Sequence, residues 1–164
     1  MNRITCIALL LSCFLLASKQ SYAQDYKTAL GLKFGGYENG FSAKYFAAPN
    51  IAWEGILGFR NHGAVVTGLY EIHQQAFDVP KLKFYYGFGA HLGGVGGGTY
   101  KRFNGDDRYY QDGRVLLGAD GVVGLEYVIP DSPIGFSLDL NPRIELATGP
   151  FFDLAPGLGI KYTF

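Results

Sequence analysis

The chain has 164 residues, a length that suits a single domain. Its 14 basic and 14 acidic residues balance, which excludes the strongly basic surface that nucleic-acid binding requires. The 24 glycines, together with an aromatic content of 16%, favour many short strands over a helical bundle.

Residues 1–23 have the three parts of a secretory signal peptide. Arg3 supplies the positive start, residues 4–17 form the apolar middle, and Ser21-Tyr22-Ala23 is a small-x-small cleavage site. The apolar run is too short to remain as a membrane anchor. We therefore expect Sec-type export and a mature domain that spans residues 24–164.

Cys6 and Cys13 both lie inside the predicted signal peptide. After ordinary cleavage the mature domain contains no cysteine, so neither a disulfide nor thiolate chemistry is expected. Residues 10–13 also resemble a lipoprotein cleavage box, which leaves lipidation of Cys13 as an alternative. The apolar run continues past this cysteine, and that continuation favours cleavage after Ala23.

Eight segments of the mature chain alternate apolar residues with small or polar ones, as strands with one apolar face do. Turn signals such as Asn39-Gly40 and Pro49-Asn50 separate them. The predicted strands lie near residues 26–34, 41–45, 51–60, 66–73, 82–91, 117–127, 134–145 and 152–164. The fourth is the least regular, because Val65 and Leu69 fall on its polar face. The pattern predicts an all-β, eight-stranded antiparallel up-and-down barrel.

The polar strand faces carry seven basic and seven acidic residues, whereas the apolar faces carry almost no charge. Glycine, alanine and threonine share the charged faces, and small side chains suit the narrow interior of an eight-stranded barrel. Because an unpaired buried ion costs several kcal/mol, charges in this interior must be paired. We predict an ion-pair network in the lumen that is formed by Lys27, Lys33, Lys44, Glu54, Arg60, Glu71, Lys83, Asp120, Glu126, Asp139, Arg143, Glu145, Asp153 and Lys161.

The last predicted strand ends on an aromatic residue, with apolar residues at alternate positions before it: Leu158, Ile160, Tyr162 and Phe164. This pattern resembles the C-terminal insertion signal of Gram-negative outer-membrane barrels. The resemblance implies recognition by the barrel-assembly machinery. Pro156 removes one hydrogen-bond donor from this strand, so we expect a β-bulge there.

The whole mature chain resembles the small eight-stranded outer-membrane barrels of the OmpX and OmpA transmembrane-domain type. The resemblance implies a transmembrane β-barrel in the cell outer membrane, with an apolar band against outer-membrane lipid. Short turns would face the periplasm, and the long stretch 92–114 would be extracellular. Aromatic residues near strand ends would lie at the membrane interfaces: Tyr26, Tyr45, Trp53, Tyr70, Tyr127 and Tyr162.

The stretch 92–114 mixes aromatic residues with cations, a composition that protein interfaces favour. We predict that it is a surface-interaction loop for an extracellular protein or glycan. The residues of this predicted loop site are Tyr100, Lys101, Arg102, Phe103, Arg108, Tyr109 and Tyr110. The alternative is that the two segments, residues 100–103 and 108–110, pair as a protruding hairpin above the membrane.

No catalytic, cofactor-binding or metal-binding residues are expected. His62, His73 and His91 are too far apart in sequence for a ligand pair, and the acidic residues of 106–112 do not match a calcium loop. A Gly-x-Ser-x-Gly motif does not occur. His91 lies on a predicted inward face, where a hydrogen-bonding role in the lumen is expected.

The sequence therefore predicts an integral outer-membrane barrel with a closed, charge-paired lumen and a structural or surface-interaction role. Two functional alternatives remain, which are a narrow pore and an enzyme that modifies outer-membrane lipid, such as a lipid A acyl hydrolase or transferase. A soluble lipocalin-like carrier, with an apolar lumen and a polar exterior, is the architectural alternative.

Overall fold

The structure is a computed structural model that describes residues 26–36, 38–60, 62–102, 107–147 and 151–164. The predicted signal peptide lies outside these residues. The described residues form ten strands: β1 (Thr28–Gly35), β2 (Asn39–Ala48), β3 (Ile51–Arg60), β4 (Gly63–Gln75), β5 (Leu82–Val95), β6 (Gly98–Tyr100), β7 (Arg108–Tyr110), β8 (Arg114–Val128), β9 (Ile134–Glu145) and β10 (Phe151–Thr163). Among the described residues, no helix is long and apolar enough to cross a bilayer.

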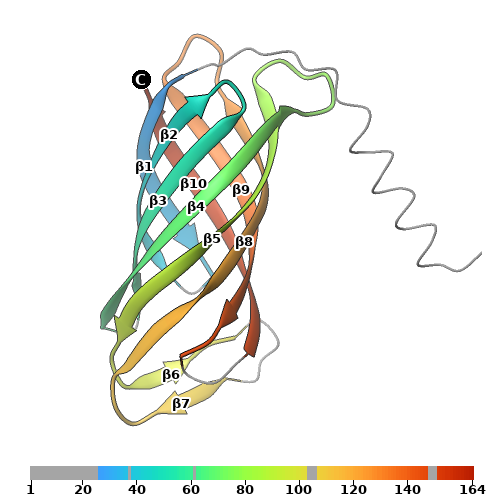
Figure 1. Cartoon of the computed structure of the whole chain (residues 1–164). Coiled ribbons are helices and arrows are strands. Elements are labelled where there is room, and N and C mark those ends of the chain that lie inside the picture. The colour runs from blue at the N-terminus through green and yellow to red at the C-terminus, as the bar shows by residue number, and fades with distance from the viewer. Residues whose placement is uncertain (1–25, 37, 61, 103–106, 148–150) are drawn as a thin grey trace, which may run out of the picture.

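Eight of these strands form a closed barrel in the order β1-β10-β9-β8-β5-β4-β3-β2 (Figure 1). Every neighbouring pair is antiparallel, and strands that follow one another along the chain lie side by side in the barrel. The short strands β6 and β7 pair with each other as a separate sheet. The predicted eight-stranded antiparallel barrel is confirmed.

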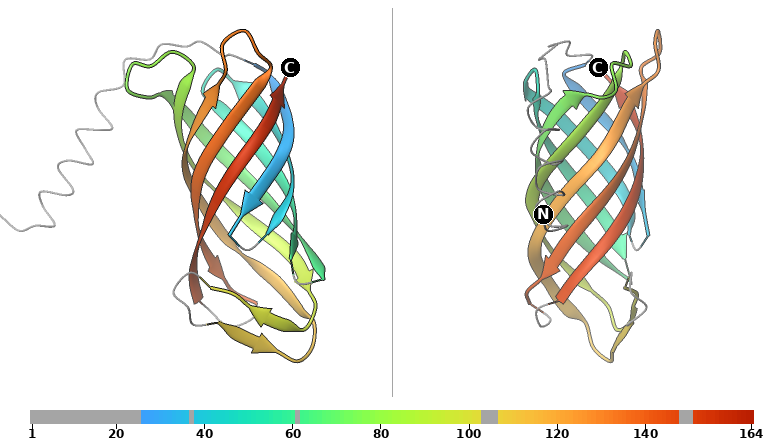
Figure 2. Two further views of the ribbon diagram at one scale, coloured as in Figure 1. Left: turned by 180° about the vertical axis from the view of Figure 1, so that it is seen from behind. Right: turned by 90° about the vertical axis from the view of Figure 1, so that its right-hand side faces the viewer.

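The barrel has two different ends (Figure 1). The C-terminus and the turns β2–β3, β4–β5 and β8–β9 lie at one end, which we call the terminal end. The β6–β7 hairpin lies at the opposite end, which we call the mouth (Figure 2). β5 runs to Val95 and β8 begins at Arg114, so the stretch predicted as irregular from residue 92 to 114 is much shorter and contains this hairpin.

The strands of the barrel are strongly staggered and therefore tilted against its axis. If the paired residues are followed from Ala29 on β1 through β2 and once around the barrel, the walk ends at Asp153 on β10. Ala29 itself pairs with Thr163 on β10, so the strands are staggered by ten residues over one circuit of the barrel. With a rise of about 3.3 Å per residue and about 4.8 Å between strands, this stagger corresponds to a tilt of roughly 40°. Residues at one height in the lumen therefore come from very different sequence positions.

Pro156 causes no bulge, so that prediction is wrong. It pairs with Leu140 in an unbroken β9–β10 register, and its carbonyl accepts the Gly36 amide at 2.9 Å. The backbone nitrogen of Pro156, which has no hydrogen to donate, faces β1. β1 ends at Gly35, so no strand hydrogen bond is lost there. A register shift occurs instead between Phe46 and Ala48 on β2.

The barrel is apolar outside and polar inside, as the alternation predicts. Large apolar side chains are exposed on all eight barrel strands, for example Phe41 at 60%, Leu138 at 62% and Phe88 at 67%. Among the described residues, the exposed charged side chains lie only at the two ends of the barrel. They are Lys27, Asp78, Lys81 and Asp131 at the terminal end, and Lys101, Asp107, Asp112 and Arg114 at the mouth.

Candidate functional site: the barrel interior and its covered mouth

The lumen is filled by polar and charged side chains. Of the fourteen residues predicted for the ion-pair network, thirteen are buried. Lys27 is the exception and corrects that prediction, because its side chain is exposed and its ammonium lies 5.9 Å from the ring centre of Tyr45. Lys27 precedes β1, so the inward–outward alternation has not yet begun there. Tyr26, predicted at a membrane interface, is instead 6% exposed and points inward.

Lys44 is the centre of a charge cluster near the terminal end. Its ammonium lies 3.2 Å from Glu54, 2.7 Å from Glu71 and 3.1 Å from Glu126, which belong to three different strands. Lys161 adds a second cation, 2.9 Å from Glu54 and 3.7 Å from Glu126. We call these five residues the terminal-end cluster. Two cations thus cross-link strands β2, β3, β4, β8 and β10 through shared carboxylates.

Aromatic side chains enclose the terminal-end cluster. Tyr26 donates a hydrogen bond of 2.6 Å to Glu126, and a ring nitrogen of His73 lies 2.9 Å from Glu71. Phe46 packs edge-on against Tyr26 at 5.1 Å between ring centres. Tyr26 and Phe46 belong to an apolar cluster that also contains Ala29, Ala52 and Val128. These buried residues fill part of the lumen at the terminal end.

Tyr85 links the terminal-end cluster to the middle of the lumen. Its ring stacks on His73 at 5.0 Å and lies 4.5 Å from the Lys44 ammonium. Its hydroxyl donates a 2.7 Å hydrogen bond to Asp139, which also pairs with Lys33 at 3.1 Å. Asp139 is therefore held from two sides of the barrel.

Small residues on the inward faces make room for these groups. A Cβ at Gly157 would lie 2.5 Å from an Asp139 carboxylate oxygen, and one at Gly124 would lie 2.8 Å from the Tyr85 ring. Leu69 and Val122, both buried, pack with Tyr85 at this level. Leu69 is one of the two residues that made the predicted fourth strand irregular, and it contributes an apolar layer between two charged ones.

A second set of charged residues lies nearer the mouth. One ring nitrogen of His91 is 2.7 Å from Asp120 and the other is 3.1 Å from Glu145. Arg143 donates a 3.0 Å hydrogen bond to Asp120 and also pairs with Glu38. We call these five residues the mouth cluster. Both His91 nitrogens are occupied by carboxylates, in agreement with the hydrogen-bonding role expected for this residue.

The β6–β7 hairpin lies across the mouth (Figure 2). On one side, Arg60 of β3 donates a 2.7 Å hydrogen bond to the Lys101 carbonyl and stacks 3.6 Å above the Tyr100 ring. On the other side, Arg102 donates a 3.0 Å hydrogen bond to the Phe152 carbonyl of β10. The hairpin emerges between β5 and β8, so these contacts pass over the intervening strands β4 and β9.

The predicted surface-interaction site is only partly on the surface, because Tyr100 turns inward and Arg102 and Arg108 are half-buried, and its binding of an external partner stays a prediction. Tyr100 is 1% exposed and packs with Val65 and Phe151, and burial raises the pKa of its hydroxyl. The predicted cations Arg102 and Arg108 stack on Phe151, at 4.4 Å and 4.9 Å from its ring centre.

Of the other predicted members, Tyr110 is partly buried against the same apolar cluster. Lys101 and Tyr109 are exposed, Tyr109 at 73%, and Phe103 lies outside the described residues. The alternative prediction is confirmed for the pairing, because Gly98–Tyr100 pairs with Arg108–Tyr110, but the hairpin contacts β3 and β10 across the mouth and does not protrude.

The four residues of the predicted C-terminal signal all face outward on β10. Their exposed fractions are 45% for Leu158, 39% for Ile160, 48% for Tyr162 and 64% for Phe164. They therefore belong to the apolar exterior and not to the lumen.

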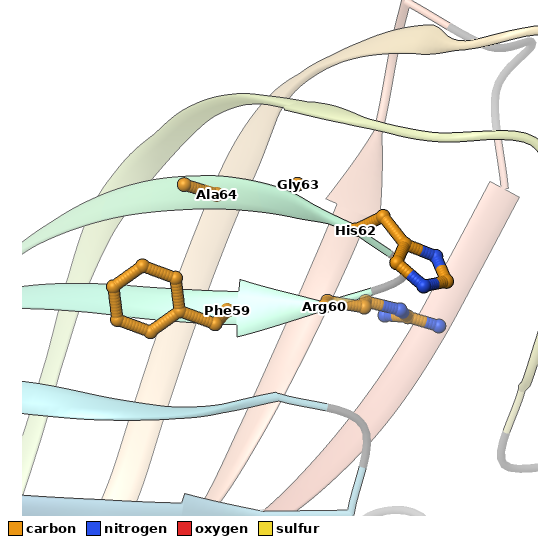
Figure 3. A pocket seen from close by; sticks show the side chains of 5 residues that line it. All are labelled: Phe59, Arg60, His62, Gly63 and Ala64. Carbon is orange, nitrogen blue, oxygen red and sulfur yellow. The ribbon is translucent and has the colours of Figure 1, made fainter.

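An open surface depression at the β3–β4 turn is lined by Phe59, Arg60, His62, Gly63 and Ala64 (Figure 3). Arg60 and His62 lie together beyond the tip of β3, while the Phe59 ring lies apart from them (Figure 3). The Arg60 guanidinium is already engaged by the hairpin. In the described part of the chain, His, Cys, Asp and Glu side chains form no group of three that could hold a metal ion.

Comparison with protein-family models gives no match for this chain, and a search of curated proteins gives none either. The site is therefore interpreted from its geometry. Sequence reasoning missed Glu38 because it lies in a predicted turn. It also omitted Tyr85 from the network, although Tyr85 shares its strand face with Lys83.

Proposed function

We propose that this chain is an integral outer-membrane β-barrel of the OmpX and OmpA transmembrane-domain type, with a closed lumen and a structural, non-catalytic role. The observation that carries the proposal is the outer surface between the barrel ends, where every strand exposes large apolar side chains and the described residues expose no charge. Soluble monomers rarely expose apolar patches larger than a few hundred Å². A soluble carrier would have the opposite arrangement.

The dimensions support a membrane location. β3 has ten residues. At about 3.3 Å per residue and a tilt of roughly 40°, such a strand rises about 25 Å, which is the height of the apolar band of outer-membrane barrels. The exposed charges at the two ends would then lie in the headgroup regions.

Aromatic residues near the terminal end also fit a membrane interface. Tyr45, Trp53 and Tyr70 are direct neighbours on β2, β3 and β4, and the Trp53 and Tyr70 rings are 5.0 Å apart. Trp53 is 56% exposed. Amphipathic aromatic rings gather at the interface of outer-membrane barrels in this way.

The packed interior favours a closed barrel over a pore. Ion pairs and apolar clusters alternate along the lumen, and the hairpin covers the mouth. An enzymatic role finds less support, because both nitrogens of His91 face carboxylates and neither is free to act on a hydroxyl. The expected partners are outer-membrane lipid and, through residues 158–164, the barrel-assembly machinery.

Cell fractionation combined with lipid quenching tests the proposal. The mature protein should fractionate with outer membranes and migrate faster in a gel before heating than after it. Trp53 is the single tryptophan, so its fluorescence in vesicles should be quenched by lipids brominated near the headgroup. In planar bilayers the protein should give no steady ion conductance. Recovery in the soluble periplasmic fraction with unquenched Trp53 would refute the membrane location, and stable channels would refute the closed lumen.

A further inference from the structure

The β6–β7 hairpin is held on the mouth by contacts that a separate peptide could also make. It pairs with itself and not with the barrel sheet. Two arginine side chains attach it to the barrel by hydrogen bonds to backbone carbonyls: Arg60 of β3 to the hairpin, and Arg102 of the hairpin to β10. The same two arginines also stack on aromatic rings, Arg60 on Tyr100 and Arg102 on Phe151. None of these contacts depends on the covalent connection between the hairpin and the barrel.

Glycines border both ends of the hairpin. Residues 96–98 are three consecutive glycines after β5, and Gly113 precedes β8. Gly98 has a φ of 140°, a conformation that residues with a side chain rarely adopt. Glycine has the backbone freedom that hinges of moving loops require.

The wall of the mouth and the hairpin have opposite charges. Wall carboxylates outnumber wall guanidinium groups by four to two, and His91 adds at most one further positive charge. The wall residues are Glu38, Asp120, Glu145 and Asp153 against Arg60 and Arg143. In the sequence of the hairpin the cations are in excess by one, with Lys101, Arg102 and Arg108 against Asp106 and Asp107.

The hairpin does not satisfy every polar group that it buries. Among the described residues, the hydroxyls of Tyr100 and Tyr110 and Nε of Arg102 have no hydrogen-bond partner. Tyr100 is 1% exposed. Because a buried donor without a partner costs free energy, the covered state is less stable than a fully bonded one.

We propose that the mouth of the barrel is a binding site for a cationic peptide segment that carries an aromatic residue, and that the β6–β7 hairpin occupies this site as an internal competitor. An external segment binds when the hairpin swings out. Its cations take the places of Arg102 and Arg108 on the Phe151 ring, beside a wall of net negative charge, and its aromatic ring takes the place of Tyr100 against Arg60. The binding site does not depend on a membrane location, so either proposal can fail without the other.

The test uses the full mature chain in detergent and a fluorescent peptide with the sequence of residues 97–102, Gly-Gly-Thr-Tyr-Lys-Arg. A Tyr100→Ser/Arg102→Ser variant loosens the hairpin and leaves the wall intact. Fluorescence anisotropy should show that this variant binds the peptide at least about tenfold more tightly than the wild type, because the competent state is more populated. The matched control, Tyr109→Ser, changes an exposed hairpin residue and should bind as the wild type does.

A peptide in which the lysine and arginine are replaced by glutamate should not bind either variant. Equal binding of the two peptides, or no gain in the loosened variant, overturns the proposal. A second measurement reports whether the hairpin covers the mouth. It uses Val65→Cys, because Val65 packs with Tyr100 and the mature chain contains no other cysteine. A water-soluble maleimide should label this thiol faster in the loosened variant, and an unchanged rate would show that the hairpin does not cover the site.

Discussion

Replacing Lys44 with methionine should strongly destabilise the barrel. The Lys44 side chain is fully buried, and its ammonium contacts three carboxylates within 3.2 Å. Without it, Lys161 still pairs with Glu54 and Glu126, but the Lys44 contact of Glu71 is lost. Methionine fills a similar volume, so the loss is mainly one of charge compensation.

The magnitude follows from the cost of leaving a buried charge unpaired. Breaking one buried ion pair costs about 3–5 kcal/mol, and here one cation serves three carboxylates. The free energy of unfolding should therefore fall by at least about 3 kcal/mol, which shifts the unfolding equilibrium by more than roughly 100-fold.

Urea unfolding in lipid vesicles, followed by the fluorescence of Trp53, measures this loss. Lys27→Met is the matched control, because it removes the same charge from an exposed position and should leave the urea midpoint unchanged. A second change, Glu71→Gln in the Lys44→Met background, should recover part of the stability because it removes a buried carboxylate that has lost its lysine partner and keeps only its contact with His73. If Lys44→Met unfolds at the same urea concentration as Lys27→Met, the lumen is hydrated enough to screen its charges and the reasoning is refuted.

Three further substitutions, one of them with a matched control, test the packing of the barrel by the same unfolding measurement. Gly89→Ala places a Cβ against a backbone carbonyl of β4 and should cost about 1–3 kcal/mol, whereas Gly55→Ala, where nothing lies within 4 Å, should be neutral. Tyr85→Phe removes the 2.7 Å hydrogen bond to Asp139 and should cost about 1–3 kcal/mol; no loss would mean that this carboxylate finds another donor. Pro156→Ala should change stability by less than about 0.5 kcal/mol, and a larger gain would show that the proline interrupts the ladder after all.

Much of the barrel could be predicted from local patterns. Strand side chains alternate with a period of two, so the apolar and polar faces, the number of barrel strands and the inward position of thirteen predicted charges all follow from neighbouring residues. The exceptions lie where a strand begins or ends. Lys27 and Tyr26 precede β1, and Glu38 precedes β2, so the period gave the wrong face for the first two and no assignment for the third.

The partners of each charge could not be predicted in this way. Lys44 and Glu126 are 82 positions apart in sequence, and they meet because the closed barrel staggers its strands. That stagger depends on how all eight strands pair at once, and the sequence of any one strand does not contain it. The balance of seven cations and seven anions predicted pairing in general, but not the shared contacts of Lys44 or the bridging position of His91.

At the mouth too, the sequence predicted the composition of the hairpin but not its contacts. Composition alone identified a stretch rich in aromatic residues and cations, and such a stretch is typical of an exposed binding loop as much as of a hairpin that folds inward. What decides between them is the surface beneath it, where Arg60, Phe151 and the wall carboxylates come from β3, β10 and other strands. The sequence by itself determined which side of each strand is polar, because that is a property of neighbouring residues. The tertiary structure alone decided that the hairpin turns inward, because its contacts exist only once the barrel has closed.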